Sequence, residues 1–368
     1  MKLTLEPLSP VNDPWEPERN RRTGSHLLTS VEVTVTNRCN MRCRHCAVGE
    51  TLAMADPPRL PLDLLYRRLA EVEGLSTLSI TGGEPSESWA TLREYVLPLL
   101  RWAKERGLRT QINTNLTYEL ERYELIAPYL DVLHISWNYT GVEDFHRIAW
   151  SHGREHVPIS SSERLYNRIV SNAEALAKGG CFVSAESMIN RETAPHLGQL
   201  NRMIAAMGCQ RHEVHPMYAA DWAQDLPVLS LDEYRTATDR FLDERDLDLW
   251  ALFGTFPFFP CSPLPEDRAL IAKAKGAPNL SIRNCPDGRN RINISAFSGD
   301  LYVTDFADVA ALGNLVADPL QAAFDRWQTD PRFAPFNCYC PEAGCTGPNL
   351  LVAHMYHPGV DFRTRRAF

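Results

Sequence analysis

The chain has 368 residues and a formal net charge of −8 at pH 7. That length can bury a large core and suggests one large domain beside a smaller one. A negatively charged surface repels phosphate backbones, so we exclude DNA and RNA as partners. No stretch reaches the ~20 apolar residues of a membrane helix, and the N-terminus lacks the apolar core of a signal peptide. We therefore expect a cytoplasmic protein with no membrane partner.

The first two thirds of the chain alternate between strand-like and helical patterns. Residues 1–29 show no periodicity and predict an extended arm. Apolar, β-branched runs then predict strands at Val31–Thr36, Leu75–Thr81, Leu108–Asn113, Val132–Trp137, Cys181–Ile189 and Arg211–Pro216. Three- and four-residue apolar spacing predicts helices at Leu62–Val72, Trp89–Glu105, Ser161–Ala177 and Thr193–Ala206. Six such β and α units predict an α/β fold in which residues 30–220 form a partial (β/α)6 TIM-type barrel.

The pattern changes after residue 220. We expect a helical linker over 221–250, with a helix near Leu231–Leu247, and a smaller α+β module over 251–368. Pro and Gly dominate that module, and Ile292–Phe306 predicts a hairpin.

Three cysteines lie within eight residues after the first barrel strand: Cys39, Cys43 and Cys46. In a chain with no export signal, such clustering indicates metal or catalytic use rather than disulfides. Three thiolates can hold three irons of a cubane cluster and leave the fourth iron open to a small molecule. A zinc knuckle is the alternative, although zinc sites favour paired CxxC spacings and four ligands.

The second barrel strand ends in Thr81 followed by Gly82, Gly83, Glu84 and Pro85. A glycine pair lets the backbone approach a ligand closely, and the following acid suits an amine. By itself this run would be a turn in most proteins.

Together, CxxxCxxC after a strand and Gly-Gly-Glu-Pro one βα unit later resemble the radical S-adenosylmethionine (SAM) enzymes. The resemblance implies a [4Fe-4S] cluster on Cys39, Cys43 and Cys46 whose open iron chelates SAM. It also implies that the Gly82 to Pro85 motif holds the methionine amino group of SAM.

Further positions match that family more loosely. His45 stands where the family has an aromatic residue near adenine, and Ile189 is a further expected adenine contact. Asn115 matches a residue near the ribose or the reacting centre, and Ser136 matches a serine that contacts SAM. Arg147 matches an arginine that binds the SAM carboxylate, with a surface ion pair as the alternative.

The sixth predicted strand carries two candidate substrate contacts. Alternation along a strand places Glu213, His215 and Met217 on one face. His215 and Tyr218 are candidate catalytic residues, and the alternative is that each is a hydrogen-bonded core residue.

A second cysteine group, Cys338, Cys340 and Cys345, lies near the C-terminus. With Cys285, the hairpin and the Gly313-Asn314 turn, it resembles the SPASM and Twitch auxiliary-cluster modules. Cys285 is then the expected fourth ligand of one auxiliary [4Fe-4S] cluster, and Cys261 is the alternative fourth ligand. A zinc site on the same thiolates is the rival interpretation.

The module also departs from that pattern, because Thr304 stands where the relatives have a cysteine. Asp305 follows it and matches an aspartate that acts as a base in SPASM-type sulfatase maturases. The alternative role of Asp305 is to cap the end of the hairpin.

Over nearly its whole length the chain resembles the radical SAM CxCxxxxC-motif (YfkAB-like) family. The resemblance implies an oxidoreductase that cleaves SAM to a 5′-deoxyadenosyl radical, abstracts a hydrogen atom and oxidises or rearranges a small molecule. Modification of a ribosomally made peptide is the alternative, and a redox-sensing or zinc-binding protein without turnover is the alternative of another class. A flavodoxin- or ferredoxin-type protein is the implied electron donor.

Overall fold

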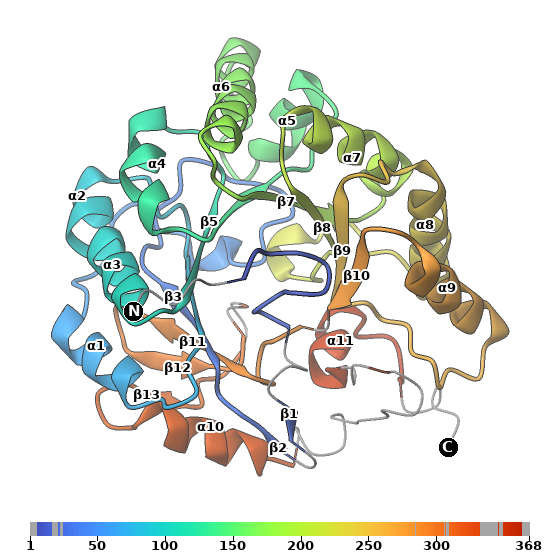
Figure 1. Cartoon of the computed structure of the whole chain (residues 1–368). Coiled ribbons are helices and arrows are strands. Elements are labelled where there is room, and N and C mark those ends of the chain that lie inside the picture. Colours follow the sequence, from blue (N-terminus) through green and yellow to red (C-terminus); the bar gives the residue numbers. More distant parts are fainter. Residues whose placement is uncertain are drawn as a thin grey trace.

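The computed structural model describes residues 6–16, 21–22, 25–283, 285–304, 306, 309–331, 345 and 349–362. At its centre, parallel strands form a curved wall, and helices cover the outer face of that wall (Figure 1). Within the described residues, the main sheet has eleven strands in the order β10-β9-β8-β7-β6-β5-β4-β3-β11-β12-β13.

All six predicted barrel strands are confirmed. They are β3 (Ser30–Thr34), β4 (Thr77–Thr81), β5 (Arg109–Thr114), β6 (Val132–Ser136), β7 (Val183–Ile189) and β8 (Arg211–Pro216). Each pairs in parallel with the next, as the partial-barrel prediction requires. Two more parallel strands, β9 (Trp250–Gly254) and β10 (Leu280–Arg283), extend the wall beyond the predicted six.

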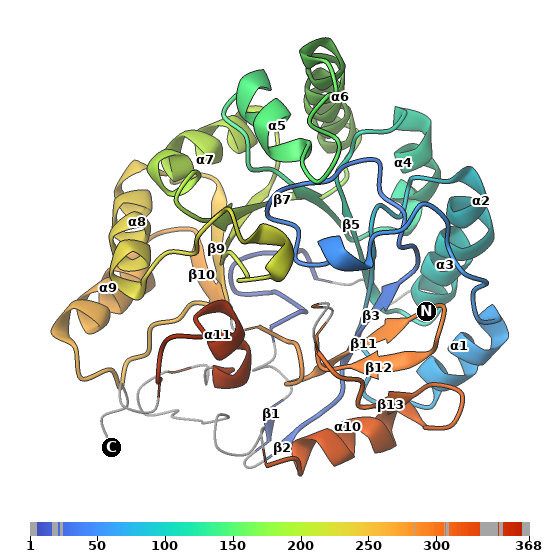
Figure 2. The same ribbon diagram turned by 180° about the vertical axis from the view of Figure 1, so that it is seen from behind.

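Helices pack outside the strands and bury their apolar faces against them (Figures 1 and 2). They are α1 (Leu62–Ala70), α2 (Trp89–Thr91), α3 (Leu97–Glu105), α4 (Leu120–Ile126), α5 (Val142–Ala149), α6 (Ile159–Lys178), α7 (Leu197–Ala206), α8 (Leu231–Glu244), α9 (Pro265–Gly276) and α10 (Leu320–Gln328). Helix α11 (Leu350–Tyr356) lies instead near the centre of both views (Figures 1 and 2), where Val352 and Tyr356 pack with Tyr218 and Phe306. A π-helical turn, Leu92–Val96, joins α2 to α3. Helix α8 begins at a capping box, in which Ser230 and Glu233 each bond the backbone N–H of the other. In the described part of the chain, no helix is long and apolar enough to cross a membrane.

The predicted C-terminal hairpin joins the barrel. Strand β11 (Arg291–Ser295) pairs in parallel with β3, and β12 (Asp300–Tyr302) pairs antiparallel with β11. The short β13 (Gly313–Asn314) follows, and α10 lies beside this edge in both views (Figures 1 and 2). The hairpin therefore lies next to the strand that precedes the cysteine loop. The domain boundaries expected near residues 30, 220 and 250 stay predictions.

The N-terminal arm folds back onto the barrel. Trp15 is fully buried and donates its indole N–H to the Ser79 hydroxyl at 3.1 Å. Asp13 accepts a 2.8 Å bond from Arg283 at the end of β10. A short antiparallel pair, β1 (Arg21–Arg22) and β2 (Ser25–His26), precedes the barrel.

The inward positions of the barrel are polar. Outward residues such as Leu78 and Ile80 are fully buried in the apolar core, and alternation turns their neighbours inward. In the barrel, His134 bonds Glu186 at 2.8 Å, and Glu213 pairs with Arg283 and His215. TIM barrels usually fill this space with branched apolar side chains. Buried charges are costly unless paired, and these acids are paired within the barrel itself.

Candidate active site

The cysteine loop follows β3 at the carboxyl edge of the sheet, and its three cysteines are half-buried. Backbone bonds fix it to the end of α5: the N–H groups of Arg42 and Arg44 donate to the carbonyls of Ala149 and Ile148, each at 3.0 Å. The loop is therefore held in shape by the protein itself.

The three thiols lie close enough to influence one another. Burial is the main cause that raises the pKa of the Cys39 thiol to about 12. The nearby Glu84 carboxyl and Cys46 thiol add to this increase. Burial likewise raises the pKa of Cys43 well above its ordinary value, and Cys39 and Cys46 add to the shift. Such a set of thiols is ionised by binding metal, since a cation offsets the clustered negative charge. Among the described residues, no group of three or more His, Cys, Asp or Glu side chains is arranged so that it could hold a metal ion.

The glycine pair fits the Gly82 to Pro85 loop against the cysteine loop. Gly83 N–H donates to the Thr36 carbonyl at 2.7 Å, and Glu84 N–H donates to the Arg38 carbonyl at 2.8 Å. A Cβ at either glycine would collide with one of those two carbonyl oxygens, and Gly82 has a φ of +140°. Glycine is needed here because the two loops touch backbone to backbone.

Glu84 lies under this contact and is fully buried. Its carboxylate accepts bonds from Ser86 N–H and Oγ, from Thr114 Oγ1 and, at 2.6 Å, from Asn115 N–H. Burial raises its pKa despite these bonds, which act in the opposite direction. The side chain thus ties the end of β4 to the end of β5, with its oxygens already occupied by protein donors.

Asn115 and His45 both lie at the cysteines. Asn115 Nδ2 is 3.7 Å from Cys39 Sγ. His45 is buried, and burial lowers its pKa to about 4, so the ring is neutral. Its Nδ1 is one of the buried polar atoms in the described residues that have no hydrogen-bond partner. An orphaned polar atom on the residue next to Cys46 in the chain fits a bound ligand such as SAM.

The other predicted cofactor contacts, Ser136, Arg147 and Ile189, lie in three different surroundings. Ser136 is exposed at the end of β6, opposite Glu186 in the register. Arg147 on α5 pairs with Asp144 at 3.0 Å and with Glu192. The Ile189 side chain is buried in the apolar core, and its carbonyl accepts the Met217 N–H at 3.1 Å, so both are engaged within the protein.

The candidate substrate residues lie in two different surroundings. His215 Nε2 bonds Glu213 at 2.7 Å, and the ring lies against Gly254, where a Cβ would collide with it. The pKa of His215 is raised, because Glu186 and Glu213 outweigh the opposing effect of burial. Tyr218 stacks on Phe306 with ring centres 3.9 Å apart. Both residues are thus held by protein contacts.

Two residues near the cysteines were not predicted from the sequence. Trp222 donates its indole N–H to the Cys43 carbonyl at 2.9 Å, and its ring covers Gly49. Tyr139 is buried, and burial together with the nearby Cys43 raises the pKa of its hydroxyl. No local motif marks either residue.

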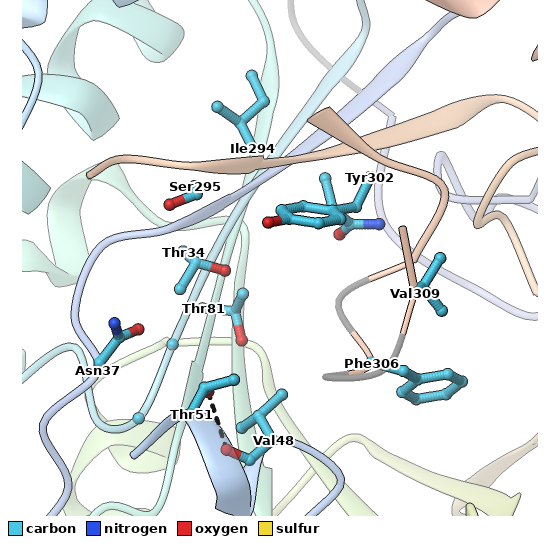
Figure 3. A pocket seen from close by; sticks show the side chains of 13 residues that line it. Thr34, Asn37, Val48, Thr51, Thr81, Ile294, Ser295, Tyr302, Phe306 and Val309 are labelled. Carbon is cyan, nitrogen blue, oxygen red and sulfur yellow. Dashed lines mark hydrogen bonds between the residues drawn. The ribbon is translucent and has the colours of Figure 1, made fainter. Parts of the chain in front are cut away.

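A cavity of about 220 Å³ opens beside the glycine pair, between the cysteine loop and the hairpin (Figure 3). Its lining is Thr34, Asn37, Val48, Thr51, Thr81, Gly82, Gly83, Asn293, Ile294, Ser295, Tyr302, Phe306 and Val309. The Tyr302 ring points into it (Figure 3). Hydroxyl and amide groups face apolar ones, and the lining carries no charged side chain.

The auxiliary-cluster residues are only partly described. Cys338, Cys340 and Asp305 lie outside the described residues, while Cys285 and Cys345 are half-buried. Burial raises the pKa of Cys285, which packs against the aromatic group of Tyr218, Phe306 and Tyr356. Cys261 instead packs against the main core.

Comparison with solved structures identifies the fold. SuiB of Streptococcus suis, solved bound to S-adenosylmethionine, superposes with a TM-score of 0.56 over 83% of this chain and 66% of SuiB, at 14% identity. The enzyme anSMEcpe, solved with AdoMet and a peptide, gives a TM-score of 0.56 over 81% of this chain and 80% of that one, also at 14% identity. The chain shares their fold, and it spans about two thirds of SuiB.

Sequence comparison adds closer relatives. A GTP 3′,8-cyclase of Helicobacter pylori (strain HPAG1) is 34% identical over 92 residues, which are 24% of this chain and 28% of that protein. Residues 33–189 match the radical SAM superfamily, and residues 217–367 match the YfkB-like domain. Protein YfkA of Bacillus subtilis (strain 168) is 47% identical over 365 residues, covering 99% of this chain and 98% of that protein. The chain therefore belongs to the YfkAB-like family of radical SAM proteins.

Proposed function

We propose that this protein reductively cleaves SAM and uses the product to remove a hydrogen atom from a substrate. The observation that supports this most is the docking of the Gly82-Gly83 backbone on a preformed loop with three cysteines. When bound to Cys39, Cys43 and Cys46, a [4Fe-4S] cluster supplies the electron that splits SAM into methionine and a 5′-deoxyadenosyl radical.

Each residue then has a defined task. The backbone of Gly82 and Gly83 takes the methionine amino group, because the Glu84 carboxylate is occupied by protein donors. Glu84 positions the loop, and the neutral His45 ring offers Nδ1 to the adenosine half of SAM. Trp222 covers the cysteine loop and excludes water from it.

Anaerobic reconstitution tests the proposal. The wild-type protein should bind iron and release 5′-deoxyadenosine from SAM under reductant. Alanine at Cys39, Cys43 or Cys46 should abolish this release, whereas Cys181→Ala, a cysteine outside the loop, should not. A colourless protein with stoichiometric zinc would instead support a zinc-binding protein without turnover.

For the substrate, we propose a small molecule with uncharged polar groups. The glycine side of the cavity of about 220 Å³ is assigned to SAM, and its hairpin side, lined by Asn293, Ser295 and Tyr302, is uncharged and offers amide and hydroxyl groups to a substrate. A peptide is the second candidate, favoured by the fold shared with SuiB, which was solved bound to the precursor peptide SuiA. Cell extract split by size decides between them: the small-molecule fraction should stimulate 5′-deoxyadenosine release, and stimulation by the peptide fraction alone would favour the peptide.

For the C-terminal module, we propose one auxiliary [4Fe-4S] cluster on Cys285, Cys338, Cys340 and Cys345, which would accept an electron and make the net reaction an oxidation. Zinc is the alternative metal at this site, and Cys261 is the alternative to Cys285 as its fourth ligand. Asp305 is the proposed catalytic base. A variant with alanine at Cys39, Cys43 and Cys46 isolates this site: about four remaining irons per chain support the cluster, and zinc in their place rejects it. A flavodoxin- or ferredoxin-type donor in the cytoplasm is part of the same proposal.

A further inference from the structure

One polar atom in the wall of the cavity has no partner in the protein. Asn293, at the centre of β11, lines the cavity between the cysteine loop and the hairpin, and this residue is only 2% exposed. Its Oδ1 is buried, and no donor among the described residues reaches it. Of the described residues that line the cavity, Asn293 alone has a buried polar atom in this condition. A buried acceptor without a donor is costly, so the wall is complete only when something donates to it.

The orientation of the Asn293 amide follows from the carboxylate behind it. Nδ2 donates to Asp287 Oδ1 at 3.4 Å, and Arg291 Nη1 lies 3.4 Å from the same oxygen. An ionised carboxylate only accepts hydrogen bonds, so turning the amide by 180° would set two acceptors against each other. Asn293 therefore gives its N–H to Asp287 and leaves Oδ1 to an occupant of the cavity.

The sheet holds Asn293 in place from both sides. Strand β11 lies between β3 and β12, and in the register Asn293 is opposite Glu32 on one side and Tyr302 on the other. Alternation along β11 places Ser295 on the same face as Asn293, and Ser295 also lines the cavity. A side chain on a paired strand keeps a more precise position than one on a loop, as recognition of a ligand requires.

The other polar groups on the hairpin side are engaged within the protein. Ser295 Oγ accepts the N–H groups of Phe297 and Ser298 at 3.4 and 3.3 Å. The Tyr302 hydroxyl donates to Asp300 Oδ2 at 3.3 Å. The described lining carries no charged side chain that could pair with an ion. One neutral acceptor is therefore the group that a ligand on this side has to match.

We infer that Asn293 selects the substrate, because its Oδ1 accepts a hydrogen bond from an uncharged N–H or O–H group such as an amide or an alcohol. The inference rests on the proposed function and narrows its substrate to molecules that carry such a donor. Water can satisfy the oxygen before the substrate binds, so a substrate that displaces this water must replace its hydrogen bond. A site of this kind rejects an analogue of the same shape that lacks the donor.

The test uses two neutral probes of the same shape, benzamide and acetophenone, which differ only in carrying NH₂ or CH₃ on the carbonyl carbon. Each is titrated into the reconstituted, unreduced protein with SAM bound, and ligand-observed NMR gives its dissociation constant. Asn293→Leu is similar in size and has no acceptor. The preference for benzamide over acetophenone should be about threefold to tenfold larger in wild type than in Asn293→Leu, which is the contribution of one neutral hydrogen bond.

Asn172→Leu is the matched control. It also removes a buried amide, one that lies outside the cavity on α6 and donates to the carbonyls of Leu116 and Tyr118 at 3.1 and 2.8 Å. General damage to the fold weakens both probes alike, so Asn172→Leu should keep the wild-type preference. If Asn293→Leu does not fold, Asn293→Ala, which lacks the acceptor and adds no bulk, carries the same comparison.

An equal preference in wild type and the Asn293 variant would overturn the inference, and so would a wild type that binds neither probe. Release of 5′-deoxyadenosine under reductant, measured on the same preparation, reports the proposed function separately. A preparation that releases it but shows equal preferences keeps the proposed function and loses the inference. If wild type forms no cluster and releases no 5′-deoxyadenosine, the proposed function has failed first and the inference fails with it.

Discussion

Glu84 holds Asn115 in place: the buried carboxylate accepts the backbone N–H of Asn115 at 2.6 Å. Because the Asn115 side chain reaches Cys39, this bond connects the Gly-Gly-Glu-Pro loop to the cysteine loop through β5. Glu84 thus positions Asn115 beside the cysteine loop.

We predict that Glu84→Gln destabilises the protein by about 2 kcal/mol, because the amide N–H₂ must face a donor where a carboxylate oxygen accepted one. Urea unfolding of the metal-free protein measures this loss. Glu94→Gln, on the exposed side of the π-helical turn, is the control and should change the free energy of unfolding little. Equal stability of Glu84→Gln and wild type would contradict the clamp role.

His45→Phe should weaken SAM binding about fivefold, since it keeps a ring but removes the unpartnered Nδ1, and one hydrogen bond contributes about 1 kcal/mol. Equilibrium dialysis with the reconstituted protein gives the Kd, and iron content shows that the cluster is intact. His152→Phe changes an exposed imidazole that stacks on Trp222, and should bind SAM as wild type does. An unchanged Kd in His45→Phe would remove His45 from the SAM site.

Trp222→Ala should make the cluster more sensitive to oxygen. The indole ring covers Gly49 and its N–H holds the Cys43 carbonyl, so alanine opens a path for solvent to the cysteine loop. Bleaching of the cluster absorbance in air should be several-fold faster than in wild type, while iron content before exposure stays equal. Trp222→Phe separates the two contacts, because it keeps most of the cover and loses the N–H. A bleaching rate in Trp222→Ala that equals wild type would show that the cover is unimportant.

The barrel strands were predictable because β3 to β8 carry β-branched or apolar runs separated by amphipathic helices. Strand β9 was missed, since a five-residue apolar run beside prolines has no periodicity that separates strand from buried loop. The parallel pairing of β11 with β3 was also hidden, because it joins residues about 260 positions apart and depends on tertiary packing.

The site shows the same division between local and distant information. CxxxCxxC and Gly-Gly-Glu-Pro are visible in the sequence because their chemistry depends on neighbours along the chain. Trp222 lies 179 residues from the carbonyl it binds, and Tyr139 has no recurring spacing to Cys43. Glu84 was recognised as a motif residue, yet only the structure shows that its carboxylate binds protein donors.

His212 should make the stability of the protein depend on acid pH. The ring is fully buried on β8, bonded to Asn201 and Ser187 at 3.0 Å each, and burial lowers its pKa to about 3. The unfolded chain binds a proton near pH 6.5, but the folded chain does not until about pH 3, so this contribution to stability is complete above 6.5 and is lost as pH falls toward 3. The expected loss in that window is about 1.4 kcal/mol per pH unit.

Urea unfolding of the metal-free protein at pH 7 and pH 5 measures this effect. His212→Gln removes the titrating ring and should flatten the difference between the two pH values by about 2 kcal/mol. His156→Gln, an exposed histidine, is the control and should retain the wild-type slope. If His212→Gln keeps the full wild-type slope, the acid sensitivity arises elsewhere, and the neutral buried state of His212 is not what limits stability below pH 6.5.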